Sequence, residues 1–157
     1  MNLRKTCMII LHRNYEKKNL YKKILTDEFI LDNISNYSLI PSDLWVEFKD
    51  KILKSKKKIG IQINSDENIK LIENDLKKIS MIQIHFKTFK DGRPFTLAKT
   101  LRRKFNFTKE IRASGHILPD QFVFLLRCGF DSVEIEKKDK NIWLELLEMD
   151  NGLYYQP

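Results

Sequence analysis

The side chain of Arg93 follows an Asp-Gly pair, at a point where the chain leaves a predicted strand. The planar guanidinium of arginine binds two oxygens of a carboxylate, a phosphate or a sulfur oxyanion at once. A tight turn explains Asp91 and Gly92 without any ligand, with Gly92 taking a positive φ. Arg93 is not needed for such a turn, and it is therefore a candidate anion-binding residue. A structural ion pair is the alternative.

Ser114-Gly115-His116 is a second candidate site, because it lies between a predicted strand and the start of a predicted helix. Backbone N–H groups at a helix start can bind an anion. One glycine is far short of a phosphate-binding loop, and Pro119 removes one free N–H. His116 could act as an acid or a base near neutral pH, and a surface or capping role is the alternative.

Asp120 and Gln121 occupy the first turn of the helix that follows. An aspartate there gains from the helix dipole, and Gln121 could cap the preceding loop. Both residues could instead belong to the site, if Asp120 pairs with Arg93 or Arg112 and orders the surrounding side chains.

Cys128 is the candidate redox group, although its predicted place at a helix C-terminus disfavours a thiolate. A buried, unreactive thiol is the alternative, and Cys7 is similar. No CxxC pair occurs, and the three histidines do not have metal-ligand spacing, so we expect no metal. No dinucleotide fingerprint follows any strand, and two distant cysteines cannot hold an iron–sulfur cluster, so we expect no cofactor.

Strands and helices alternate over most of the chain. Hydrophobic periodicity predicts strands at 59–63, 81–86, 110–114 and 132–135. It predicts helices that Ser42, Ser65 and Thr96 cap, a helix that begins at Pro119 and ends at Gly129 in a left-handed cap, and a last helix at 143–147.

This alternation predicts an α/β domain with about four parallel strands, as half of a β/α barrel or as a small doubly wound sheet. We expect one domain over 1–157, with an α/β core at 41–150 and a tail at 151–157. Residues 1–40 suit short strands, at Cys7–Leu11 and Glu28–Leu31. Ligands of parallel α/β folds bind beyond the carboxyl ends of the strands, and this rule selects one rim. The rim comprises His85, Lys87, Lys90, Asp91, Gly92, Arg93, Ser114, Gly115, His116, Asp120, Gln121, Glu136, Lys137 and Lys138.

The composition is that of a basic globular domain. Its 157 residues include 29 basic and 21 acidic side chains, which gives a net charge of +8. Such a charge attracts anionic partners, but a chain-wide abundance of lysine, isoleucine and asparagine explains it equally well. No apolar stretch is long enough to span a membrane, no signal peptide is expected, and free thiols fit the reducing cytosol.

Three segments together resemble a known family: Phe89–Ala98 with Leu101-Arg102, Glu110–Gln121, and Arg127–Asp131. They are similar, in order and spacing, to the motifs of the bacterial domain of unknown function 934. Ile40–Trp45 resembles the family's Pro-x-x-x-Trp segment, and Tyr155-Gln156 resembles its usual end. The resemblance marks Asp91, Gly92, Arg93, Arg102, Arg112, Gly115, Asp120, Gln121, Gly129, Phe130 and Asp131, with Thr96 in place of the commoner serine.

The resemblance implies a link to sulfite reduction, because members are commonly encoded beside sulfite reductase and a sulfonucleotide reductase. The first hypothesis is a cytoplasmic accessory protein that binds such a reductase or a sulfur oxyanion through Arg93, Arg112 and His116. Asp91, Gly92, Ser114, Gly115, Asp120 and Gln121 complete that predicted site. The second is a stand-alone enzyme for a small anionic substrate, with His116 as acid or base or Cys128 as redox group. A nucleic-acid binder ranks third.

Overall fold

A computed structural model describes residues 6–13, 15–25 and 34–154, without the side chains of 151–154. Its strands form one eight-stranded sheet in the order β2-β1-β8-β7-β6-β5-β4-β3. The strands are β1 (Met8–His12), β2 (Glu16–Lys17), β3 (Lys22–Lys23), β4 (Ser38–Pro41), β5 (Ile59–Asn64), β6 (Met81–Phe86), β7 (Glu110–Gly115) and β8 (Ser132–Glu136). The helices are α1 (Ser42–Lys54), α2 (Arg93–Arg103), α3 (Phe122–Cys128) and α4 (Lys140–Tyr154).

The sheet is mixed and eight-stranded, whereas the sequence predicted about four parallel strands and short N-terminal strands beside them. The four predicted strands are confirmed as β5 to β8, and they pair in parallel. β3 and β4 extend this parallel part on one side. On the other side, β1 pairs antiparallel with both β8 and β2. The sequence analysis missed β4, because Ser38–Pro41 is short and directly precedes a helix, so only the helix start was recognised there.

The N-terminal region contributes a hairpin and an edge strand. The strand predicted at Cys7–Leu11 is confirmed as β1, one residue further along. The strand predicted at Glu28–Leu31 lies outside the described residues. β2 and β3 end the sheet on opposite sides, yet only residues 18–21 connect them.

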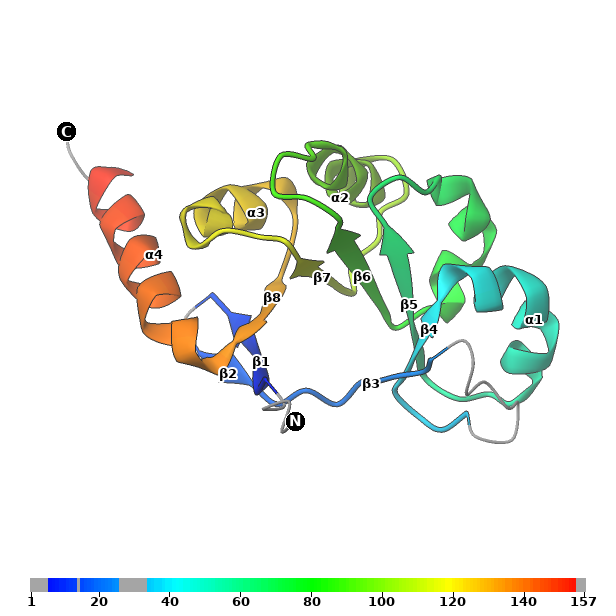
Figure 1. Cartoon of the computed structure of the whole chain (residues 1–157). Coiled ribbons are helices and arrows are strands. Elements are labelled where there is room, and N and C mark those ends of the chain that lie inside the picture. Colours follow the sequence, from blue (N-terminus) through cyan, green and yellow to red (C-terminus); the bar gives the residue numbers. More distant parts are fainter. Residues whose placement is uncertain (1–5, 14, 26–33, 155–157) are drawn as a thin grey trace.

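This short connection requires a curled sheet. Five residue steps from Lys17 to Lys22 span at most about 18 Å, at ~3.3–3.6 Å per residue. The outer strands of a flat eight-stranded sheet would lie about 34 Å apart, at ~4.8 Å per strand. The sheet therefore forms the predicted half-barrel, and Figure 1 shows α1 to α4 along its outer side, with the segment before β3 crossing below. The alternative of a doubly wound sheet, which has helices on both faces, is wrong.

The hydrophobic core lies between the outer face of the sheet and the helices. Alternate strand residues such as Ile61, Ile84 and Ala113 are fully buried there, together with Trp45 of α1 and Leu125 of α3. The residues between them on each strand face the inside of the half-barrel. We call this inner side the concave face.

Several helix starts differ from the prediction. α1 begins at Ser42, and Pro41, not Ser42, is its N-cap residue. The Ser42 hydroxyl instead donates to the Glu67 carboxylate. The segment after Ser65 forms two 3-10 helices, η3 (Ile69–Leu71) and η4 (Glu73–Lys78), instead of one α-helix. Asn68 Oδ1 accepts a hydrogen bond from Lys70 N at 3.0 Å and thereby caps the first of them.

α2 also begins before its predicted cap, so Thr96 lies inside the helix and is not its N-cap. Gly92 is the N-cap residue with φ −86°, so the positive φ predicted for Gly92 is wrong. Asp91 explains this start, because its Oδ1 accepts a hydrogen bond from Arg93 N at 3.0 Å. Pro94 in the first turn needs no partner for its nitrogen.

Two predicted helix boundaries are confirmed. Pro119 begins η5 (Pro119–Gln121), which leads directly into α3. Gly129 is the left-handed C-cap of α3, with φ 112°. The last helix is longer than predicted: a 3-10 turn, η6 (Lys137–Asp139), leads into α4, which continues to Tyr154 through residues that were predicted as tail. No helix in the described part of the chain combines the length and hydrophobicity that a membrane crossing requires.

Candidate functional site

The concave face is lined by polar side chains. The strand register aligns Gln62, Gln83 and Arg112 on β5, β6 and β7. One layer closer to the carboxyl ends, it aligns Asn64, His85 and Ser114. Asn19 and Tyr21 contact Arg112 on this face, and Gln83, Arg112 and Ser114 are buried there. The cavity that these residues line is therefore the candidate site.

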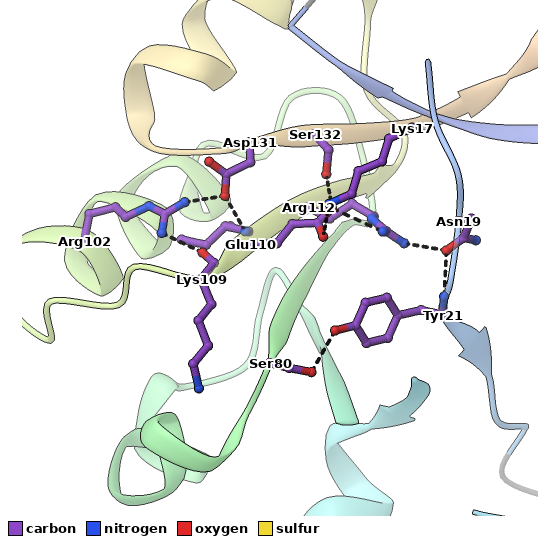
Figure 2. Close-up of polar contacts among 11 residues, drawn as sticks. Lys17, Asn19, Tyr21, Ser80, Arg102, Lys109, Glu110, Arg112, Asp131 and Ser132 are labelled. Atoms are coloured by element: carbon purple, nitrogen blue, oxygen red, sulfur yellow. Dashed lines mark hydrogen bonds and ion pairs between the residues drawn. The ribbon is translucent and has the colours of Figure 1, made fainter. Parts of the chain in front are cut away.

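Arg112 lies at the centre of this face, and its side chain is only 1% exposed. Its Nη1 donates to Asn19 Oδ1 at 3.1 Å, and its Nη2 donates to Glu110 Oε1 at 3.2 Å (Figure 2). The Tyr21 ring lies 5.6 Å from its guanidinium carbon. Within the described residues its Nε has no hydrogen-bond partner. A buried charged donor without a partner is rare in proteins, and it indicates a missing ligand or water.

Glu110 balances the charge of Arg112. Its carboxylate also accepts hydrogen bonds from Lys17 Nζ at 2.9 Å and from Ser132 Oγ at 2.8 Å. Burial alone would raise the pKa of Glu110, but Arg112, Lys17 and Ser132 outweigh it and hold the pKa below its usual value. Glu110 is therefore ionised at neutral pH, and it fixes one side of the guanidinium.

A cavity of about 160 Å³ lies beside Arg112. At ~30 Å³ per water it could hold about five water molecules or one small oxyanion. The Nε2 of Gln83 donates to Gln62 Oε1 at 3.2 Å, while the Oε1 of Gln83 has no partner within the described residues. The cavity is lined by Asn19, Tyr21, Lys23, Leu39, Gln62, Gln83, His85, Arg112, Ser114 and Glu134.

His85 contributes a neutral imidazole to the cavity. Burial lowers the pKa of His85, and the nearby cations of Lys23 and Lys87 lower it further. Its Nδ1 lies 3.1 Å from the Oγ of Ser114, which is buried. Both residues were predicted for the rim, and the structure brings them together with Arg112.

Asp91 and Arg93 lie together outside this cavity, in the turn that begins α2. Arg93 Nε donates to Asp91 Oδ1 at 2.9 Å, and its Nη2 donates to Asp91 Oδ2 at 2.8 Å. The guanidinium holds the pKa of the Asp91 carboxyl well below its usual range. The Arg93 side chain is 63% exposed, and its fork binds its own turn. This is the structural ion pair that the sequence left open as the alternative.

Gly115 and His116 form the turn after β7. Gly115 has φ 88°, and a Cβ atom there would collide with the carbonyl oxygen of Phe86. That oxygen also accepts a hydrogen bond from His116 N at 2.9 Å, while the His116 residue is exposed. The turn therefore requires glycine for its own geometry.

Gln121 caps the loop, as predicted: its Oε1 accepts from Leu118 N at 3.0 Å, and its Nε2 donates to Phe89 O at 3.3 Å. Asp120 is exposed. Arg93 pairs with Asp91, and Arg112 pairs with Glu110, so neither makes the pair with Asp120 that the sequence suggested.

Cys128 lies in the hydrophobic core under α3, with 2% exposure. Burial raises the pKa of its thiol. The core is on the outer face of the sheet, so Cys128 does not line the cavity beside Arg112. Among the residues that the structure describes, no three His, Cys, Asp or Glu side chains come together as metal ligands would.

Arg102 organises the opposite, amino end of β7 and β8. Its Nε donates to Gly129 O at 2.9 Å, and its Nη2 donates to Asp131 Oδ2 at 2.6 Å. Its Nη1 donates to the carbonyl oxygens of Phe107 and Lys109, each at 2.7 Å. Asp131 Oδ2 also accepts from Ile111 N at 2.9 Å (Figure 2). We call these residues the Arg102 cluster; it joins α2, the loop before β7 and the turn before β8.

Sequence reasoning missed Gln62, Gln83 and Glu134 on the concave face, and Asn19 and Tyr21 opposite them. The alternation of apolar and polar residues in Ile59–Asn64, Met81–His85 and Ser132–Glu136 was a usable signal. Strands that are covered by helices on both faces are apolar throughout, whereas alternation indicates one open face. Asn19 and Tyr21 carried no such signal, because only the curl of the sheet brings them there.

Comparison with protein families gives one assignment: the family described as "Bacterial protein of unknown function (DUF934)" matches residues 60–157. The match covers β5 to α4, which includes Arg112 and the Arg102 cluster. Asn19, Tyr21 and Lys23 lie outside it. A search of curated proteins finds no match.

Proposed function

We propose that this chain, which belongs to the bacterial family of unknown function DUF934, binds a small oxyanion beside Arg112 as a cytoplasmic accessory protein of assimilatory sulfite reduction. The observation that carries the proposal is the buried guanidinium of Arg112, which lines the cavity and whose Nε has no partner among the residues that the structure describes. An oxyanion would supply the missing acceptor. The charge-assisted hydrogen bond would be stronger than one between neutral groups.

The charges around the cavity suit a singly charged ligand. Arg112, Lys17 and Lys23 contribute three positive charges, and Glu110 and Glu134 contribute two negative charges. One positive charge is therefore left over when His85 is neutral.

Gln83 adds a preference, because its Oε1 has no partner among the described residues and a donor on the ligand would suit it. A protonated, singly charged oxyanion such as hydrogensulfite or dihydrogenphosphate carries both an acceptor and a donor. A sulfur oxyanion of this kind also agrees with the sulfite-reduction setting that the family resemblance implies.

The predicted residues outside the cavity suit the second half of the proposal, the binding of a reductase. Arg93, His116 and Asp120 are exposed, and they lie at the start of α2, in the turn after β7 and in η5, beyond the carboxyl ends of β6 and β7. Asp91, Gly115 and Gln121 fix the shape of those segments. Loops beyond the carboxyl ends of strands are the usual binding surface of β/α folds.

Calorimetric titration with sulfite, sulfate and phosphate tests the anion site. We expect binding by the unaltered protein and a loss of at least roughly tenfold in affinity in Arg112→Met, since a charged hydrogen bond contributes ~1.5–3 kcal/mol. Arg103→Met is the matched control, because Arg103 is exposed on α2 and the same charge is removed. Equal affinities of the two variants would contradict the proposed site.

A pull-down with the tagged protein at low salt, from bacteria that synthesise their own cysteine, tests the partner. Recovery of sulfite reductase or of the sulfonucleotide reductase, reduced in Arg93→Ala, supports the accessory role. Recovery of neither reductase refutes the partner role and leaves the anion site to be judged by calorimetry.

A stand-alone enzyme for an anionic substrate is the second candidate. The observation that favours it is the neutral, half-buried His85 at the cavity wall, 3.1 Å from Ser114. A neutral imidazole can accept a proton at pH 7. His85 would thus replace His116 as the acid–base group, and Cys128, the predicted redox group, would take no part because it lies in the core. Turnover of a sulfur or phosphorus oxyanion ester that is lost in His85→Gln, with unchanged folding, would support this candidate.

A further inference from the structure

A second and larger cavity, of about 660 Å³, opens beside the first. Lys23, Gln62 and His85 line both cavities, so the two meet along these side chains. The larger cavity lies at the carboxyl ends of β4 and β5, beside the start of α1. This is the end of the strands at which β/α folds bind their ligands.

The larger cavity is far too big for a bare oxyanion. Cavities that bind small organic ligands measure ~300–1,000 Å³. The smaller cavity beside Arg112 has room for an oxyanion. The larger cavity, which shares His85 with it, has room for the rest of an organic molecule. If one molecule fills both cavities, its charged group must be at one end, in the smaller cavity beside Arg112.

The walls of the larger cavity carry fixed polar groups. Asn64 Nδ2 donates to Glu67 Oε1 at 2.9 Å, and the Ser42 hydroxyl donates to Glu67 Oε2. These bonds hold the Glu67 carboxylate in place against the end of β5. Carboxylate and amide oxygens placed in this way accept hydrogen bonds from hydroxyl groups. The lining is therefore suited to a hydroxyl-rich molecule.

We propose, on the basis of the anion site proposed above, that the two cavities bind one organic molecule with a terminal tetrahedral oxyanion and a hydroxyl-rich body. The oxyanion, a phosphate ester or a sulfonate, lies at Arg112. The body passes His85 and contacts Asn64 and Glu67. The ligand class is thus an organic oxyanion, and free sulfite or phosphate occupies only its inner part.

Calorimetry with two sets of probes tests this inference. The bare anions are inorganic phosphate and sulfate, and the organic probes are ribose 5-phosphate, glucose 6-phosphate, glycerol 3-phosphate and isethionate. We expect at least one organic probe to bind the full-length protein at least roughly tenfold more tightly than the bare anion of the same element.

Two variants then locate the body of the ligand. Asn64→Leu removes a polar group from the larger cavity. The ratio of the affinity for an organic probe to the affinity for the bare anion of the same element should then fall toward one. Asp50→Asn, on the exposed side of α1, is the control and should leave that ratio unchanged. Thermal unfolding of both variants verifies that they are folded.

The outcomes separate this inference from the function on which it rests. If bare anions bind in a manner that depends on Arg112 and no organic probe binds more tightly, the inference is wrong and the anion site stands. If organic probes bind more tightly but Asn64→Leu does not change the ratio, the body does not lie in the larger cavity, and the inference is also wrong. If no probe binds at all, both proposals fail.

Discussion

Replacing Arg102 with alanine should destabilise the fold strongly, although Arg102 does not line the cavity beside Arg112. The side chain is 22% exposed and donates four hydrogen bonds, three to carbonyl oxygens and one to Asp131. Truncating one partner of a buried ion pair costs ~3–5 kcal/mol. The Asp131 side chain is 37% exposed, and water can replace part of what it loses. We therefore expect the lower end, about 3 kcal/mol.

This loss is a large part of the stability of a domain, which is usually ~5–15 kcal/mol. At ~2–4 °C per kcal/mol for a chain of this size, it corresponds to a fall of roughly 6–12 °C in Tm. Urea unfolding measures the change directly, with the fluorescence of the buried Trp45 and Trp143 as the signal.

Arg103→Ala is the matched control, because Arg103 is the next residue of α2 and is exposed. Its effect should stay within ~0.5 kcal/mol. If Arg102→Ala lowers the free energy of unfolding by less than about 1 kcal/mol, the Arg102 cluster is not a structural element. A ligand-binding role for Arg102 and Asp131 then has to be considered.

Three further measurements follow from the described contacts. Gly129→Ala should destabilise the protein by ~1–3 kcal/mol in urea unfolding, because φ is 112° and the new Cβ would lie 2.7 Å from Arg102 Cγ; an effect below ~0.5 kcal/mol would contradict that geometry. In the native protein a thiol reagent should modify the exposed Cys7 rapidly and the buried Cys128 only after unfolding, and equal rates would show that Cys128 is accessible. Because the pKa of Glu110 is depressed, its ionised side chain stabilises the fold above the carboxyl pKa of the unfolded chain, ~4.3, and this stabilisation is lost as the pH falls through the lower folded pKa. The free energy of unfolding of Glu110→Gln should therefore fall less than that of the unaltered protein over this acid range. Superimposable profiles of stability against pH would refute this contribution.

The sequence predicted the central strands well, because β5 to β8 are short apolar runs and turn or helix signals separate them. Gly129 and Pro119 were placed correctly for a local reason: a left-handed C-cap and a first helical turn depend on the residue itself. Ser42 was misplaced because a hydroxyl can serve several partners, and Thr96 was misplaced because Asp91 starts α2 before it. The partner that decides for Ser42 is Glu67, which lies 25 residues away.

The candidate site was predicted less well, since the rule applied to it considered only the carboxyl ends of the strands. Arg112 lies inside β7, and its environment depends on Asn19, which is 93 residues away in the sequence. No local pattern predicts a contact of this kind. The family motif also combines residues with different roles: Arg102 and Gly129 hold the fold together, while Arg112 lies in the cavity.

The pairing of β1 with β8 has a consequence for synthesis of the chain. β1 leaves the ribosome first, but its neighbour β8 follows roughly 120 residues later, which takes about 6–25 s at ~5–20 residues per second. During that interval Ile9, Ile10 and Leu11, all buried in the finished protein, have only β2 as a neighbouring strand. The nascent chain is then most exposed to aggregation at its N-terminus, and a chaperone that binds short apolar segments would act there until translation passes β8.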